Sequence, residues 1–270
     1  MGMRSVRYEE MLPREIVARR TAHPVAYLPL GGIEWHGEHL AVGNDALKAH
    51  ALSCRAAHAG GGIAFPPLWY GEPRLERLME VSGDPGGIAR KMKLPRDQFK
   101  RKNFRDDAGT QLARYRDLVR HTLDQIRSLG FRAIVILAGH YPLREFVAPV
   151  VRAFNRAHAD CRAWAGIEFH FPAGGHRNSK EVGGDHAAKW ETSYLMALRP
   201  ECVDLSVYRG RAPGEKLVGV GGEDPRAEAS RELGERACAL IAAGMARRGD
   251  ALLAQIARAK RKPRRPRRKK

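Results

Sequence analysis

The sequence has few cysteines, few acidic residues and no long apolar run, and each shortage excludes a class of protein. Its 270 residues include only 4 cysteines, which are far apart: Cys54, Cys161, Cys202 and Cys238. This spacing predicts reduced thiols rather than a disulfide framework or a zinc clip. No apolar run is long enough to span a bilayer, and the N-terminal segment lacks the apolar core of a signal peptide. We therefore expect a cytoplasmic protein with no membrane segment.

Acidic residues are outnumbered by basic ones, 30 against 48, which gives a net charge of +18. Residues 258–270 hold ten of these cations and no anion, and without them the net charge falls to +8. Such a block repels itself, so we expect one folded domain over residues 1–250 and a basic, disordered tail over 251–270. Two interpretations of the tail stay open: a solubilising segment, or a segment that binds polyanions non-specifically.

The rest of the chain alternates short apolar runs with amphipathic segments. We expect strands at 25–30, 63–68, 133–138 and 163–169, and helices at 7–20, 45–59, 110–129, 143–158, 185–198 and 226–248. The run Ala133–Ala138 is apolar at every position, as a central parallel strand requires. This alternation predicts an α/β fold with a mostly parallel sheet. Residues 71–107 are expected to form a long loop, whose basic stretch 91–105 is either a solvated face or a lid.

The first predicted strand ends in a Gly-Gly turn, and charged side chains follow it closely. They are Glu34, His36, Glu38, His39 and Asp45. Carboxylates and imidazoles so close together are costly to bury unless a positive charge such as a divalent metal is shared among them. Alternate residues of an extended segment point the same way, so Glu34 and His36 can face one site, with Glu38 as a third candidate. The alternative is a polar loop with solvated charges.

Further candidate ligands lie elsewhere in the chain. His140 ends the predicted central strand, and His186 and Glu191 belong to a late predicted helix. Strand ends meet at one edge of a parallel sheet, so His140 can converge with the first cluster. Carboxylates combined with imidazoles suit Zn²⁺, Mn²⁺ or Fe²⁺. A bridging Asp45 would suit two metal ions about 3.5–4 Å apart.

Four segments together resemble the creatininase (creatinine amidohydrolase) family. They are the motif 29–40 with Asn44-Asp45, the strand end 134–140, the segment 185–200 and the segment 221–235. The resemblance runs, with gaps, from about residue 5 to residue 248. It implies a three-layer α/β/α fold, two divalent metal ions, hydrolysis of a carbon–nitrogen bond in a small-molecule amide, and a homo-oligomer, often a hexamer.

The resemblance also assigns roles to residues of this chain. The metal ligands are Glu34, His36, Asp45 and His140, with Asp45 bridging, and we infer that Glu191 supplies the remaining carboxylate. His186 matches the histidine that transfers protons. We assign substrate binding to His39, Tyr141 and Trp190.

The chain departs from the family pattern at several places. Creatinine-hydrolysing members have a glutamate ligand where this chain has Pro142, and a tryptophan where it has Val182. The usual Phe-Pro-Gly-Thr segment is replaced by the basic stretch. These departures argue against creatinine as the substrate and leave open a weakened second metal site.

We therefore predict a metal-dependent amidohydrolase that cleaves a non-peptide C–N bond, in a cyclic amide or a formamide, by metal-activated water. The alternative is a non-catalytic scaffold of the same fold that binds nucleic acid or an acidic partner through its basic tail. Retention of all five predicted ligands favours the enzyme.

Overall fold

The computed structural model describes residues 5–71, 85–95, 103–173, 176 and 179–261. Four parallel strands form one sheet in the order β2-β1-β3-β4. Their bounds are β1 (Val25–Leu30), β2 (Ile63–Ala64), β3 (Ala133–Ala138) and β4 (Arg162–Gly166). Every residue of β1 and β3 is buried, as the apolar runs predict for strands covered on both faces.

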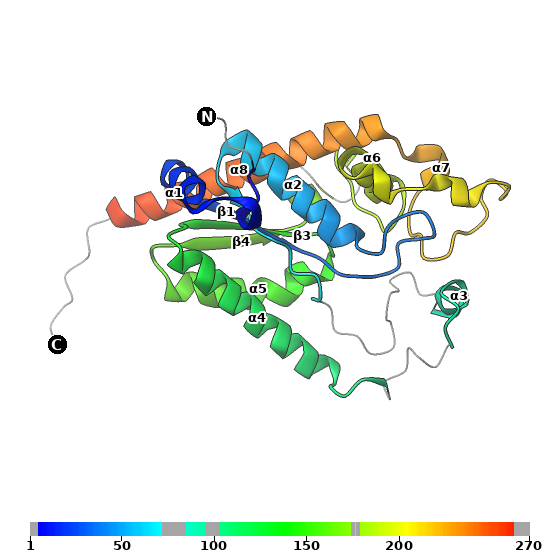
Figure 1. The fold of residues 1–270 in the computed structure, drawn as a ribbon, viewed down its shortest axis with the longest axis horizontal. Helices are drawn as coiled ribbons and strands as arrows, with labels where there is room; N and C mark the ends of the chain where they lie inside the picture. The colour runs from blue at the N-terminus through cyan, green and yellow to red at the C-terminus, as the bar shows by residue number, and fades with distance from the viewer. Residues whose placement is uncertain (1–4, 72–84, 96–102, 174–175, 177–178, 262–270) are drawn as a thin grey trace.

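Helices cover both faces of the sheet, which confirms the predicted three-layer α/β fold (Figure 1). On one side lie α2 (Asn44–Gly60), α6 (Lys189–Leu198) and α8 (Arg231–Arg261), and on the other lie α4 (Ala108–Ser128) and α5 (Pro142–Ala157). Helix α4 packs through Tyr115, Val119, Leu123 and Ile126, which recur at helical spacing and are buried. The hydrophobic core therefore consists of the sheet and the apolar helix faces that pack on its two sides.

The sheet brings three segments to its carboxyl edge. The loop 31–43 leaves β1, His140 follows β3, and the short 3₁₀ helix Glu168–His170 follows β4. β1 and β3 pair in register from Val25↔Ala133 to Leu30↔Ala138, so both strands end at the same level. This edge is where ligands bind in open parallel sheets.

Several element bounds differ from those expected. Helix α1 is Pro13–Ala22 behind a 3₁₀ turn at Tyr8–Glu10, because Pro13 suits the first turn of a helix and not its interior. β2 has only two residues, because Pro66 and Pro67 cannot donate to the ladder. The expected loop 71–107 contains a helix α3, Pro85–Lys91, and its residues 72–84 and 96–102 lie outside the described residues.

The final helix is also longer than expected. After a short α7 (Pro225–Glu228), α8 continues to Arg261, with Leu252 and Ile256 buried beyond residue 250. Their i, i+4 spacing keeps one face of the helix apolar, so its last turns pack on the domain. The tail prediction for 262–270 falls outside the described residues. Two more 3₁₀ turns, Pro200–Cys202 and Leu205–Tyr208, link α6 to α7.

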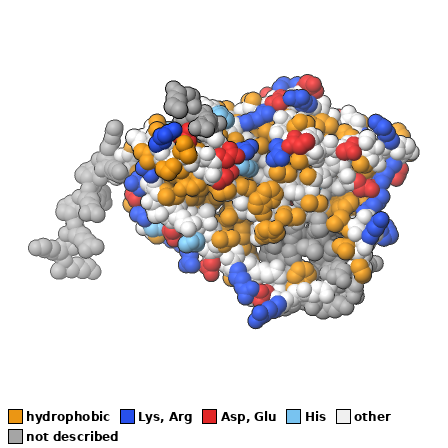
Figure 2. Space-filling model, viewed as in Figure 1, with side chains coloured by type: hydrophobic (Ala, Val, Ile, Leu, Met, Phe, Trp, Pro, Cys, Tyr) orange, Lys and Arg blue, Asp and Glu red, His pale blue; other side chains and the backbone are white. Residues whose placement is uncertain are grey.

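The surface carries no single sign of charge on the face seen in Figure 2. There, Lys and Arg side chains are interspersed with Asp and Glu around a central field of hydrophobic side chains. Within the described residues, no helix combines the length and the hydropathy needed to cross a membrane.

Candidate metal centre

The predicted metal ligands come from four parts of the chain and meet at the carboxyl edge of the sheet. Glu34 and His36 lie on the loop after β1, and Asp45 lies in the first turn of α2. His140 follows β3, and Glu191 lies in the first turn of α6. Each is at most 3% exposed, so the alternative of a solvated polar loop is excluded.

Asp45 lies at the centre of this cluster. Its Oδ1 is 3.0 Å from Nε2 of His36. Its Oδ2 is 3.2 Å from Nδ1 of His140, which is also 2.8 Å from Oε1 of Glu34. The two oxygens of Asp45 therefore face two different imidazoles, which is the arrangement that a bridging carboxylate needs.

Two backbone carbonyls orient two of the histidines. Nδ1 of His36 is 3.2 Å from the carbonyl oxygen of Glu34, so this nitrogen donates and Nε2 faces the cluster. Nε2 of His186 is 2.9 Å from the carbonyl oxygen of Trp35, which leaves Nδ1 of His186 directed at Oε1 of Glu34, 3.8 Å away. Nδ1 of His186 therefore faces the predicted ligands, but it lies farther from the nearest carboxylate than the ring nitrogens of His36 and His140 do.

The pKa shifts of the cluster indicate that its buried carboxylates have too few positive charges near them. Burial and the charge of Asp45 raise the pKa of Glu34 to about 7. Burial opposes ionisation of Asp45, yet the positive charges of His36 and His140 hold its pKa well below the usual range. Burial likewise opposes protonation of His36, but Asp45 and Glu191 raise its pKa well above the ordinary value. A divalent cation supplies the charge that protons must otherwise supply here.

The residues present fit such a cation. Within the described residues, two donor groups share Asp45, and the donor atoms of each lie within 4.8 Å of one another. One group is Glu34, Asp45 and His140, and the other is His36, Asp45 and Glu191. Oε2 of Glu34 is buried and has no hydrogen-bond partner in the described part of the chain, as expected of a ligand atom. His186 with Glu34 and His36 forms a third such group.

The residues assigned to substrate binding lie around this cluster in different environments. Both ring nitrogens of His39 contact protein groups, Nδ1 at 3.1 Å from Oη of Tyr208 and Nε2 at 2.9 Å from Oγ1 of Thr192. The hydroxyl of Tyr141 is buried and has no hydrogen-bond partner among the residues described. Substrate binding by these two residues stays a prediction, and Tyr141 has the freer polar atom.

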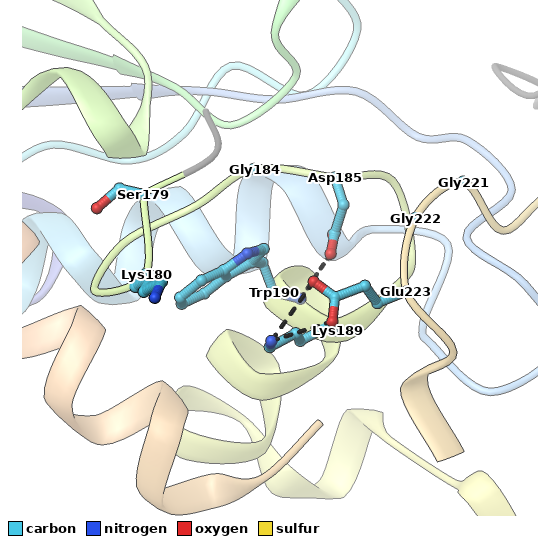
Figure 3. A pocket seen from close by; sticks show the side chains of 9 residues that line it. All are labelled: Ser179, Lys180, Gly184, Asp185, Lys189, Trp190, Gly221, Gly222 and Glu223. Atoms are coloured by element: carbon cyan, nitrogen blue, oxygen red, sulfur yellow. Dashed lines mark hydrogen bonds and ion pairs between the residues drawn. The ribbon is translucent and has the colours of Figure 1, made fainter. Parts of the chain in front are cut away.

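Trp190 lines a surface cavity of about 630 Å³ beside the cluster (Figure 3). Asp185 and Lys189 share this wall with it, and Asp185 points toward the start of α6. The Asp185 carboxylate accepts hydrogen bonds from the backbone N–H groups of Trp190 and Glu191, at 2.7 and 3.1 Å. This side chain therefore caps the first turn of α6, the turn that carries Glu191.

One candidate of the first cluster lies outside the site. Glu38 is 2.9 Å from Nζ of Lys91 and 2.6 Å from Nη2 of Arg211, so it is paired with two cations away from the other carboxylates. The prediction that Glu38 faces the site is wrong, because Gly37, at φ +69°, breaks the alternation of an extended segment.

Two buried charges beside the site are absent from the sequence-based prediction. Lys48 and Glu168 are both 0% exposed, and Nζ of Lys48 is 2.9 Å from Oε1 of Glu168. Lys48 also lies 2.6 Å from Oε1 of Glu191. Two features of the sequence could have indicated them. Lys48 follows Asp45 by three residues on one helix, and Glu168 lies just past a strand end.

Comparisons with known proteins identify relatives of this chain. The family model described as creatinine amidohydrolase matches residues 9–84 and 109–249. Creatinine amidohydrolase of Pseudomonas putida is 27% identical over 219 residues, which cover 75% of each chain. Among solved structures, a tryptophan-to-phenylalanine variant of creatininase aligns with a TM-score of 0.64 and 23% identity, covering 93% of this chain and 99% of that one.

A glutamate-to-glutamine variant of creatininase, described as of Zn-Zn type, aligns with a TM-score of 0.61 and 22% identity. It covers 94% of this chain and 99% of its own. At these identities the solved structures show a shared fold, and the family match over most of the chain shows the relationship. The chain belongs to the creatininase family, whose members are metal-dependent amidohydrolases.

Proposed function

We propose that this protein hydrolyses the C–N bond of a cyclic amide or a formamide at a site that holds two divalent metal ions. The observation that carries the proposal is the division of the buried ligands into two donor groups that share Asp45. Zn²⁺ and Mn²⁺ suit their carboxylates and imidazoles. The zinc pair named for the related structure supports two ions here.

In this proposal Glu34, Asp45 and His140 hold one ion, and His36, Asp45 and Glu191 hold the other. The chemistry that such ions supply when bound is Lewis-acid activation of water, to a pKa of about 7, and of a substrate carbonyl. Asp45 keeps the two ligand groups together, because one oxygen faces each imidazole. The shared carboxylate therefore fixes the two ligand groups relative to each other.

His186 moves the proton in this scheme. Burial lowers the pKa of His186 to about 4, so the ring is neutral at pH 7 and first acts as an acceptor. Because the carbonyl of Trp35 binds Nε2, the nitrogen that accepts and then releases the proton is Nδ1. The proton taken from the attacking water can thus pass to the departing nitrogen, as in general acid–base catalysis.

Creatinine is not the substrate that we favour. Pro142 and Val182 replace a carboxylate and an indole that the resemblance associates with creatinine, and Val182 is fully buried. The buried hydroxyl of Tyr141 offers a hydrogen bond to a small polar substrate. A cytoplasmic location, a homo-oligomer and polyanion binding by the tail stay predictions.

The test is a hydrolysis assay on protein loaded with Zn²⁺ or Mn²⁺, with creatinine, five-membered cyclic amides and formamides as parallel substrates. Mass spectrometry follows the ring-opened product of a cyclic amide or of creatinine, and the formate and amine released from a formamide; chelator-treated protein is the control. We expect metal-dependent hydrolysis of a cyclic amide or a formamide, faster than that of creatinine. Faster turnover of creatinine would contradict the substrate class, and hydrolysis that survives the chelator would contradict the metal site.

A further inference from the structure

A buried lysine, Lys48, contacts Glu191 and lies over the ring of Tyr141, the residue before the position at which creatinine-hydrolysing members carry a glutamate ligand. Pro142 has no side-chain oxygen to offer, and α5 begins at this residue. Next to it, the ring of Tyr141 has Nζ of Lys48 5.5 Å from its centroid. Nζ of Lys48 is also the atom that contacts Glu168 and Glu191. The lysine therefore connects the region of position 142 with the remaining carboxylate.

Glu191 is held at both of its oxygens. Oε1 lies 2.6 Å from Nζ of Lys48, and Oε2 accepts a hydrogen bond of 2.8 Å from the backbone N–H of Ala187. Oε2 is also 3.4 Å from Nε2 of His36, so it is the oxygen on the ligand side. With one oxygen engaged by the ammonium, only the other is available to a metal ion.

Lys48 is fixed in turn by Glu168. Both side chains are 0% exposed, so neither charge is stabilised by water. Burial opposes the charged form of Lys48, yet Glu168 and Glu191 raise its pKa well above the ordinary value. Glu168 belongs to none of the three metal-ligand groups found among the described residues. Its main electrostatic partner is Lys48. A buried ion pair of this kind adds little net stability, because the cost of desolvating both charges offsets their attraction.

We propose that Lys48 is a positioning residue that orients Glu191 as a one-oxygen metal ligand in place of the carboxylate missing at Pro142, and that Glu168 holds Lys48 in position. The proposal rests on the proposed function, because it presupposes a metal ion between His36, Asp45 and Glu191. Outer groups that orient ligands typically change metal affinity by about 10–100-fold when they are removed.

Charge and orientation predict opposite effects, which makes the proposal testable. Removing a cation beside the site makes it more negative and by charge alone strengthens metal binding. At pH 8, above the pKa of about 7 to which burial raises Glu168, the double variant Lys48→Met/Glu168→Gln removes one positive and one negative charge. The variant therefore leaves the net charge unchanged while Glu191 loses its partner. It also avoids leaving Glu168 as an unpaired buried charge, which would endanger folding.

The experiment measures Zn²⁺ dissociation constants of the full chain by competition with a chromophoric chelator. Wild type, the double variant and a control, Arg55→Met, are compared after circular dichroism confirms folding. Arg55 lies two turns after Lys48 on α2 and pairs with Glu235 at 2.6 Å, outside the cluster. The single variant Glu168→Gln, which leaves Lys48 in place, reports on the second part of the proposal.

We expect the weaker Zn²⁺ site to lose about 10-fold or more in affinity in the double variant, a smaller loss in Glu168→Gln, and no change in Arg55→Met. Equal or tighter binding by the double variant overturns the proposal while leaving the proposed function intact. A wild-type protein that binds no Zn²⁺ overturns both. If the double variant does not fold, Lys48→Gln decides, because loss of the cation alone strengthens Zn²⁺ binding by charge. Affinity equal to or tighter than that of wild type then overturns the proposal.

Discussion

Gly139, at the end of β3, lies directly against the backbone of Asp45 in α2. A Cβ atom built at Gly139 would collide with the carbonyl oxygen of Asp45, and the side chain of Ala49 would be only 3.2 Å from it. The strand end and the ligand-bearing helix can therefore approach each other only because residue 139 has no side chain. This contact sets the distance between His140 and Asp45.

We expect Gly139→Ala to lower the free energy of unfolding by about 1–3 kcal/mol or more, because backbone atoms cannot move aside as a flexible side chain can. Urea unfolding measures this change. Gly221→Ala is the matched control, since the nearest atom to its new Cβ would be 3.8 Å away. Equal stability of the two variants would show that α2 and β3 are not in close contact.

His186→Ala separates catalysis from metal binding. His186 is oriented by the carbonyl of Trp35 and stays 3.8 Å from Glu34, so we expect turnover to fall by about 10²–10⁴-fold while metal content is unchanged. Turnover and metal content are measured on the same preparation. If both fall together, His186 is a metal ligand, and its role in proton transfer is wrong.

The buried ring of His39 predicts a loss of stability in mild acid. Burial, with a further contribution from His36, lowers the pKa of His39 from 6.5 to about 4. Between these pH values the unfolded chain binds a proton at His39 that the folded chain does not. The contribution of His39 to the free energy of unfolding is therefore complete above pH 6.5 and is lost as the pH falls toward 4.

For His39→Gln we therefore expect the fall in unfolding free energy between pH 7.5 and pH 5 to be about 2 kcal/mol smaller than in wild type. Chelator-treated samples of both proteins are unfolded in urea at each pH. Contributions from other histidines cancel in this comparison. Identical pH dependence would mean that His39 is not held neutral by the fold.

The four cysteines should differ sharply in reactivity. Burial raises the pKa of Cys161 and Cys238 to about 12, and both thiols are fully buried, whereas Cys202 is partly exposed. Thiolate is the reactive form, so at pH 8 only about one in 10⁴ of the buried thiols is ionised. We expect a maleimide to label Cys202 in the native protein and to reach Cys161 and Cys238 only after unfolding. Peptide mapping that found equal labelling would contradict the packing of these two cysteines.

Much of the fold follows from local patterns. The apolar runs of β1 and β3, and the helical spacing of Leu123 and Ile126 in α4, each encode one element in a few adjacent residues. The cluster around Glu34 and His36 was also predictable, because charged residues just past a buried strand lie at the edge of the sheet where ligands bind. The parallel sheet then requires His140 to end beside them.

The charges that complete the site could not be predicted in the same way. Lys48 lies in a helix where a lysine usually faces water, and its partners are 120 and 143 residues away. Lys48 turns inward because α2 packs against α6 and because Glu168, in the segment after β4, pairs with its ammonium. Helix α6 begins at Lys189 rather than at Asp185, because the Asp185 carboxylate caps the helix from outside it.

The metal content of the purified protein tests the central claim most directly. Elemental mass spectrometry on wild type after reconstitution with Zn²⁺ or Mn²⁺ is compared with Asp45→Asn, which keeps the shape of the shared ligand and removes its charge. We predict about two ions per chain in wild type, because two donor groups share Asp45, and a loss of both in the variant. No bound metal in wild type, or the same content in both proteins, would contradict the account of this cluster as a two-metal hydrolase site.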